Sequence, residues 1–165
     1  MMSTNPDWDD LVRADQDYQE ARERVFAGDP VPALRESLAL SIPTPPGRET
    51  ALRVLDEYGR ARPNVVRALV PELFELALGQ DWRSERVRVV LSRLDAAVLE
   101  RELKPIIKAF VRETERDAAD YWGAIALLVK AGLRPLLDRV LRAAQASDDE
   151  DTRVVAQHWM AGSAG

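Results

Sequence analysis

Few residues in this sequence have the types and spacing that catalysis requires. A nucleophilic triad needs a base beside the nucleophile, yet the 165-residue chain has a single histidine, His158, and no cysteine. The missing cysteines exclude disulfides, thiolate metal sites and thiol nucleophiles. No Gly-x-Gly-x-x-Gly or Gly-x4-Gly-Lys-Ser/Thr loop occurs that could cradle a phosphate. We therefore expect no catalytic residue, metal or cofactor, and predict that the chain is not an enzyme.

Carboxylates are abundant, but no pair stands out as a catalytic acid and base. Pairs such as Glu100/Glu102 are routine on exposed helix faces. The acidic run at 148–151 follows Ser147, which fits a capping box in which the Ser147 hydroxyl accepts a hydrogen bond from the Glu150 amide. A partner or cation site is the alternative, although the run lacks the glycine and distal glutamate of a calcium loop.

An arginine-rich segment, residues 83–93, is the sharpest local feature. Between residues 60 and 93 there are seven arginines and four carboxylates, whereas residues 1–29 hold eight carboxylates and three arginines. A helix that buries the valines and leucines of 87–94 would turn arginines outward, where planar guanidinium groups suit carboxylates or phosphates. A solvated helix face is the alternative interpretation. We predict a partner-binding surface formed by Arg53, Glu57, Trp82, Arg83, Arg86 and Arg93.

The tryptophans are a second kind of candidate binding residue. Trp and Tyr are enriched at interface hot spots, because they bury a large rigid area and keep one polar contact. For Trp122 and Trp159 we favour packing between helices. Trp82 stands in a polar turn between Asp81 and Arg83, where a packed turn and an exposed anchor fit about equally well.

The overall charge and hydropathy limit the expected binding partners and cellular location. With 23 basic and 28 acidic residues the formal net charge is −5, which argues against general binding to nucleic acid or to an anionic membrane. The longest apolar stretch, residues 123–129, is far shorter than the ~20 residues of a membrane-spanning helix, and the N-terminus lacks the pattern of a signal peptide. We expect a cytoplasmic protein, and the preference for arginine over lysine is typical of a GC-rich bacterial gene.

Apolar periodicity predicts helix almost everywhere and no strand, so the expected fold class is all-α. In residues 63–78, for example, apolar side chains recur at intervals of three and four. Glycine, proline and capping residues interrupt the pattern where helices should end. The nine predicted helices span residues 6–27, 31–41, 48–60, 63–78, 83–94, 96–114, 118–131, 133–146 and 149–161.

An internal repeat organises these helices. Proline occurs inside an apolar pattern at Pro32, Pro71, Pro105 and Pro135, at separations of 39, 34 and 30 residues. Each proline helix is followed by a break and then by a second helix. A pair of short helices cannot bury its own apolar face, so four such units are expected to stack and to share one core.

The second unit resembles a HEAT repeat. Its proline helix, residues 69–76, leads through Asp81 to Val87 and Arg88 in the second helix, and the fourth unit is similar. The third unit has an aspartate at its turn, Asp117, but residues 118–122 occupy the place of the arginine in the second helix. In the first unit, residues 46–50 occupy the turn.

The resemblance implies a right-handed α-α superhelix, a HEAT-like solenoid of about four helical pairs over residues 30–161. Prolines would bend the first helices, the second helices would line a concave groove, and an aspartate–arginine ladder along the stack would be incomplete. Residues 1–29 would form an acidic N-terminal capping helix, because solenoid ends need a polar cover. Residues 162–165 would be a disordered tail.

The array and the missing catalytic residues together predict a non-catalytic protein–protein interaction module, an adaptor or an immunity-like inhibitor, that binds another protein through this groove. An acidic partner would suit the arginines. The alternative, implied by the resemblance, is a nucleic-acid-binding or DNA-repair glycosylase-type protein that uses the Arg83–Arg93 surface for phosphates and Trp82 or Trp122 for stacking. A third hypothesis is a homodimer in which the acidic N-terminal helix of one chain meets the arginines of another.

Overall fold

The structure, a computed structural model, describes residues 5–39 and 47–162. These residues form ten α-helices and no strand, which confirms the all-α prediction. Within the described ranges no helix is both long and apolar enough to cross a membrane. The helices are α1 (Pro6–Ala27), α2 (Val31–Leu38), α3 (Arg48–Tyr58), α4 (Pro63–Ala68), α5 (Val70–Ala77), α6 (Trp82–Ser92), α7 (Ala96–Phe110), α8 (Ala118–Lys130), α9 (Arg134–Gln145) and α10 (Glu150–Gly162).

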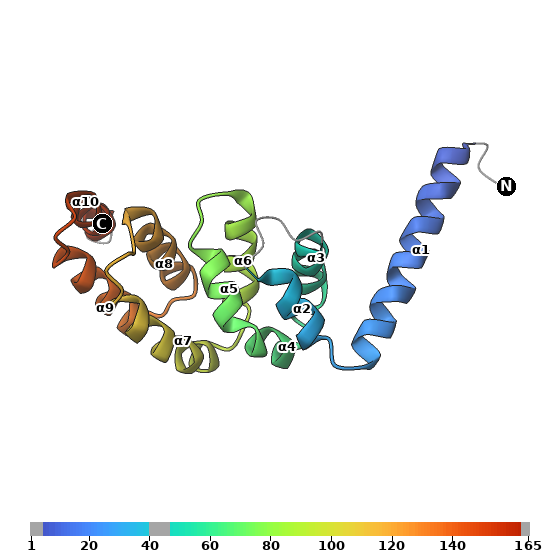
Figure 1. The fold of residues 1–165 in the computed structure, drawn as a ribbon, viewed down its shortest axis with the longest axis horizontal. Coiled ribbons are helices and arrows are strands. Elements are labelled where there is room, and N and C mark those ends of the chain that lie inside the picture. Colours follow the sequence, from blue (N-terminus) through green and yellow to red (C-terminus); the bar gives the residue numbers. More distant parts are fainter. Residues whose placement is uncertain (1–4, 40–46, 163–165) are drawn as a thin grey trace.

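From α2 onward the helices form two rows that lie side by side along an arc (Figure 1). The first row comprises α2, α5, α7 and α9, and the second comprises α3, α6, α8 and α10; within each row every helix contacts the next. The second row lies on the inner side of the arc, and α1 leans away from the array at its N-terminal end. The helices α1 and α10 therefore lie at opposite ends of the molecule.

The repeated prolines begin helices more often than they bend them. Pro32, Pro71 and Pro135 lie at the first or second position of a helix, and of the four only Pro105 lies inside one. The single helix predicted around Pro71 is wrong, because it divides at Leu69 into α4 and α5. Proline has no amide hydrogen and its ring clashes with the carbonyl four residues earlier, so the hydrogen-bond ladder is interrupted there.

Several helices are shorter than predicted. The helix α2 ends at Leu38, because Ala39 has a ψ of 131°, and residues 40 and 41 of the predicted segment lie outside the described residues. The helix α7 ends at Phe110 rather than at residue 114. At the C-terminus, Gly162 is the last residue of α10, and the rest of the predicted tail lies outside the described residues.

Aspartates at the turns cap the helices that follow them. Asp81 accepts hydrogen bonds from the amide and the hydroxyl of Ser84, each 2.9 Å long, and Asp149 accepts the same two bonds from Thr152. The predicted capping box is wrong, since the Ser147 hydroxyl accepts from the Asp149 amide, 3.2 Å away. The turn aspartates thus act within their own units rather than as a ladder between units.

One hydrophobic core runs along the array, and none of its fully buried residues comes from α1. Near its centre the rings of Phe74, Phe110 and Tyr121 pack edge to face, with consecutive centroids 5.7 and 5.0 Å apart. Gly123 in α8 lies against the turn before α6, where an added Cβ would be 2.1 Å from the Leu78 carbonyl oxygen. Only glycine permits this close approach.

Candidate partner-binding surface

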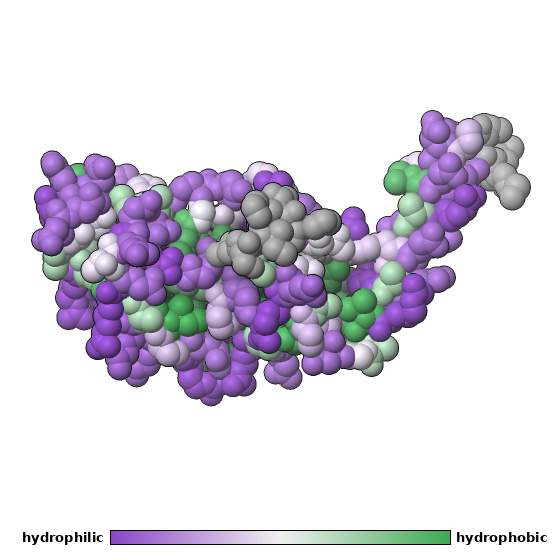
Figure 2. Space-filling view, viewed as in Figure 1, coloured by the Kyte–Doolittle hydropathy of each residue, from purple (hydrophilic) through white to green (hydrophobic). Residues whose placement is uncertain are grey.

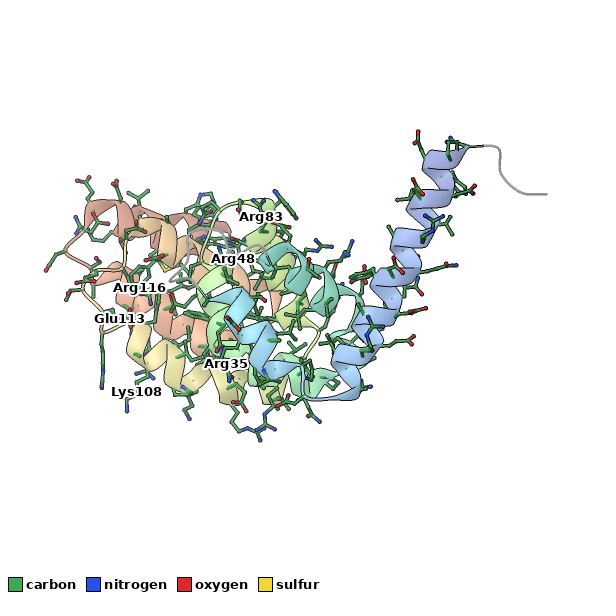
Figure 3. The ribbon with its side chains drawn as sticks, turned by 45° about the vertical axis from the view of Figure 1, so that its right-hand side comes forward. Arg35, Arg48, Arg83, Lys108, Glu113 and Arg116 are labelled. Carbon is green, nitrogen blue, oxygen red and sulfur yellow. The ribbon has the colours of Figure 1, made fainter. Side chains whose placement is uncertain are left out.

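The predicted surface arginines of α6 are paired with carboxylates of α3. Asp56 contacts Arg86 and Arg93, with N–O distances of 3.0 Å to each guanidinium. Arg83 forms an ion pair with Glu49, and Figure 3 shows Arg83 on the inner side of the array. The arginines point outward from the α6 core stripe as predicted, but they hold α6 to α3 and do not form a free cationic patch.

Similar ion pairs join successive units on the side of the first row. Arg67 of α4 donates to Glu102 of α7 over 2.7 Å. Arg116, which follows α7, makes a bidentate contact with Glu75 of α5, with both bonds 2.9 Å long. The partners are separated by 35 and 41 residues in the chain, which is close to the length of one unit. Electrostatic pairing between units is therefore a general device of this fold.

Arg53 and Glu57, two further residues of the predicted surface, attach α1 to the array. The Arg53 guanidinium lies 3.8 Å from the centroid of the Tyr18 ring, and the Tyr18 hydroxyl donates to Glu57 over 3.1 Å. Arg22 of α1 stacks over the ring of Tyr58 at 3.8 Å. These cation–π contacts and one hydrogen bond anchor the C-terminal half of α1 on α3.

The tryptophans divide into packed and exposed residues. Trp122 and Trp159 join α8 to α10 with ring centroids 5.2 Å apart, which agrees with the predicted packing, and His158 stacks on Trp122 at 5.0 Å. Trp82 instead leaves 57% of its surface exposed, with the Arg83 guanidinium 4.8 Å from its ring centroid. Its exposure agrees with the anchor interpretation.

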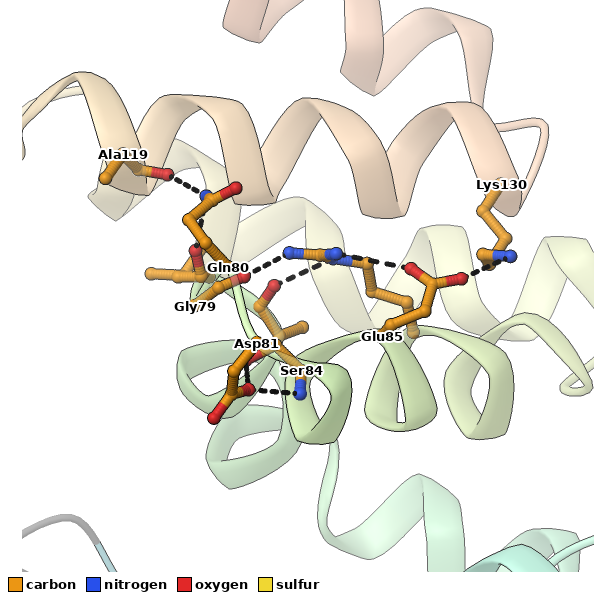
Figure 4. Close-up of polar contacts among 10 residues, drawn as sticks. Gly79, Gln80, Asp81, Ser84, Glu85, Ala119 and Lys130 are labelled. Atoms are coloured by element: carbon orange, nitrogen blue, oxygen red, sulfur yellow. Dashed lines mark hydrogen bonds and ion pairs between the residues drawn. The ribbon is translucent and has the colours of Figure 1, made fainter.

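Sequence reasoning missed that Arg88 is a buried structural residue. Its Nε donates to the Ala77 carbonyl over 3.0 Å, another guanidinium nitrogen donates to the Gly79 carbonyl, and a third contacts Glu85 (Figure 4). Glu85 also binds the Lys130 ammonium at 2.8 Å, and this hydrogen bond lowers the pKa of Glu85 below its usual value. A signal was present, since Arg88 lies three residues before Leu91, which places both on the same, buried face of the helix.

An open cavity of about 300 Å³ lies between α1 and the α2–α3 pair. We call it the N-terminal cavity. Most of its surface is apolar, and Arg22 is the single charged residue among the described residues that line it. Its apolar lining includes Ala21, Val25, Phe26, Leu34, Ala51 and Val54. Sequence reasoning did not predict this cavity, because it depends on the angle between α1 and the array.

The N-terminal half of α1 carries exposed apolar side chains. Trp8, Leu11 and Val12, which we call the α1 stripe, are 55%, 59% and 40% exposed, and every residue from Pro6 to Asp17 is exposed. In Figure 2 hydrophobic residues appear along the side of α1 that faces the array. One face of α1 carries residues that recur at intervals of three and four, at positions 8, 11, 15, 18, 22 and 25.

Comparison of the chain with family models, with curated proteins and with solved structures gives no match in any of the three. Within residues 5–39 and 47–162, no three His, Asp or Glu side chains converge as a metal site would require. The candidate surface combines an apolar cavity, an exposed tryptophan and an apolar stripe.

Proposed function

We propose that this chain is a non-catalytic protein–protein interaction module, built as a short HEAT-like solenoid and acting as an adaptor or inhibitor. Two observations support the solenoid. Each helix of the two rows contacts the next one along its row, and one core serves all the units, as expected when repeats that cannot fold alone stack on one another. Such arrays use extended surfaces to bind other macromolecules.

The N-terminal cavity is the observation that carries the proposal. Binding pockets are concave and mostly apolar, with few polar groups that fix orientation, and the cavity has this composition. Trp82 is exposed and is the first residue of α6. The next residue, Arg83, is ion-paired to Glu49 of α3. The residue of α3 that follows Glu49, Thr50, lines the cavity. The proposed partner inserts an apolar side chain into the cavity and contacts the Trp82 ring.

The ion pairs of α6 determine which class of partner fits. Because Arg86 and Arg93 share Asp56 and Arg83 binds Glu49, a phosphate would have to displace a carboxylate to reach them. An apolar anchor has no such competitor. The geometry therefore favours a protein partner over a nucleic acid.

Filling the cavity tests this function. Ala33 lines the cavity from an exposed position on α2, so Ala33→Trp should occupy the cavity without disturbing the core. Ala109→Trp adds the same side chain at an exposed position on α7 and is the matched control. The full-length wild type and both variants would be used as bait for affinity capture from the source cells, with quantitative mass spectrometry.

We expect a stoichiometric partner that is retained by wild type and by Ala109→Trp and is lost with Ala33→Trp. Equal retention by both variants, or the lack of any stoichiometric partner, would contradict the proposal. A nucleic acid retained through Arg83, Arg86 and Arg93 would also overturn it. Urea unfolding of each bait shows that a loss of binding is not a loss of folding.

A further inference from the structure

The two ends of the molecule carry surfaces that cannot meet within one chain. The α1 stripe lies at one end, and the α9–α10 pair lies at the other (Figure 1). Residues 6–17 of α1 are all exposed, so no described residue buries the stripe. Isolated helices of about 12 to 15 residues are marginal in water, which means that this half of α1 gains stability from any surface that covers it.

A groove of about 540 Å³ follows α9 and α10 at the opposite end of the array. Its apolar floor is formed by Leu137, Leu141 and Met160, and Arg134 and Arg142 lie beside that floor. A second cavity of about 160 Å³ shares Arg134 and Leu137 with it and extends the apolar surface. We call this surface the C-terminal groove.

The arginines of the C-terminal groove differ from those of α6, because no carboxylate in the described part of the chain pairs with them. Among the described residues neither Arg134 nor Arg142 forms an ion pair, and Arg142 donates only to the Asp138 backbone carbonyl, over 3.2 Å. Of the described residues that line the groove, Asp138 is the single carboxylate. An acidic segment can therefore bind here without displacing an existing ion pair.

The helix α1 has the complementary composition. It contains seven carboxylates and three arginines, and Arg13 and Arg24 already pair within the helix, with Asp10 and Glu20. Carboxylates flank the α1 stripe in sequence, so the apolar side chains and the negative charges would reach the groove together. Pairing of two α1 helices would bring two acidic segments side by side, and like charges disfavour it.

We propose that the first three turns of α1 in one copy of this chain dock in the C-terminal groove of a second copy. Trp8 and Leu11 pack on the apolar floor, and neighbouring carboxylates bind Arg134 and Arg142. The inference is independent of the N-terminal cavity, because it uses residues 6–17 and the far end of the array. It keeps the self-association hypothesis but moves the receiving arginines from α6 to α9.

The contact is head to tail, and this determines the kind of assembly. A contact between two different surfaces leaves a free stripe at one end of each dimer and a free groove at the other, so further copies can add. A three-turn helix buries less than the ~1,200 Å² of a standard stable interface. The chain therefore forms short oligomers whose size rises with concentration.

Sedimentation velocity of the full-length chain tests this association. We expect the weight-average sedimentation coefficient to rise from micromolar to millimolar protein and to fall when salt is added, because exposed ion pairs are screened. Leu11→Asp should abolish the rise. Val154→Asp is the matched control, since Val154 is 54% exposed on α10 and its replacement should leave the rise unchanged.

Mixing two inactive variants gives the decisive result. Leu11→Asp keeps an intact groove, and the double variant Arg134→Glu/Arg142→Glu keeps an intact stripe. Each alone should stay monomeric, whereas an equimolar mixture should form a dimer that grows no further.

Three results would overturn the inference: a wild type that is monomeric at every concentration, a double variant that associates like wild type, or a mixture that stays monomeric. None of these would affect the capture of a foreign partner that Ala33→Trp abolishes, so this inference and the proposed function fail separately. Urea unfolding of each variant confirms that the fold is kept.

Discussion

The helices α1 and α8 show two different ways of holding a helix. The 22-residue α1 has no buried residue, whereas the 13-residue α8 buries six, including Gly123 and Leu128. The N-terminal half of α1 depends on local signals, namely the Asn5 cap, a proline in its first turn and pairs within the helix such as Asp10–Arg13. The helix α8 is held by packing. In the N-terminal half of α1, where residues 6–17 are all exposed, the side chains are free for binding, and this is why the α1 stripe is a candidate interface.

Replacing one leucine by alanine in the core and one in α1 should give the largest difference in the free energy of unfolding. Leu73 in α5 is completely buried and Leu11 in α1 is 59% exposed. Leu73→Ala is expected to lower the free energy of unfolding by about 2–5 kcal/mol, because it removes buried methyl groups and leaves a cavity. Leu11→Ala should change it by less than about 0.5 kcal/mol. Urea denaturation of dilute protein measures both values.

A large loss of stability in Leu11→Ala would show that α1 belongs to the cooperative core, and the comparison would then be wrong. Dilute protein is essential for this measurement, since self-association stabilises the folded state by mass action.

Replacing two arginines of α6, one buried and one exposed, should give a smaller difference in the free energy of unfolding. Arg88 is 6% exposed and donates to the Ala77 and Gly79 carbonyls. Arg88→Met leaves these carbonyls without a donor and should cost about 2–3 kcal/mol. Arg83→Met breaks exposed contacts, the ion pairs with Glu49 and Asp81 and the contact with the Trp82 ring, and should cost less than about 1 kcal/mol. Equal losses of unfolding free energy would contradict this division.

The smallest expected effect is a difference in the pH dependence of stability between the helix caps of the two regions. Asn5 caps α1 with a neutral amide, whereas Asp81 caps α6 with a carboxylate. The hydrogen bond from the Ser84 amide is the main cause that lowers the pKa of Asp81. The stability from this carboxylate is complete above its unfolded pKa, near 4, and is lost as the pH falls through the lower folded value.

Asp81→Asn should therefore reduce the slope of stability against pH below about pH 4, because the amide oxygen keeps the cap but does not titrate. Urea midpoints measured at a series of acidic pH values test this. An unchanged slope would mean that the cap does not titrate with folding. The α1 helix, capped by Asn5, should keep its own cap across the same range.

Repeating local signals made much of the fold predictable. The apolar period located the helices, and the outward direction of Arg83, Arg86 and Arg93 followed from the same period. Their partners Glu49 and Asp56 could not be found in this way, because the residue opposite an arginine depends on how two units stack. The separation of 34 residues between Arg83 and Glu49 is a signal only once the unit length is known.

The parts that sequence reasoning missed depend on angles between elements. Pro71 was recognised as part of the repeat, but whether a proline bends a helix or begins a new one depends on how the neighbouring turns pack. The N-terminal cavity exists because α1 leans away from α2 and α3, and no residue type encodes that tilt by itself. Arg88 was missed for a different reason, since a charged residue on a buried stripe is expected only where nearby carbonyls need a donor.

Gly123 has a consequence for how the array can move. The backbone of α8 rests directly on the Leu78 carbonyl, so no side-chain rotation can widen or narrow the joint between the second and third units. At the joint between the first and second units side chains meet instead, because core residues of α3 and α6 pack there and arginines of α6 bind Glu49 and Asp56. A side chain added at Gly123 would therefore have to push α8 away from the second unit, whereas rotation of long arginine side chains can absorb small changes at the first joint.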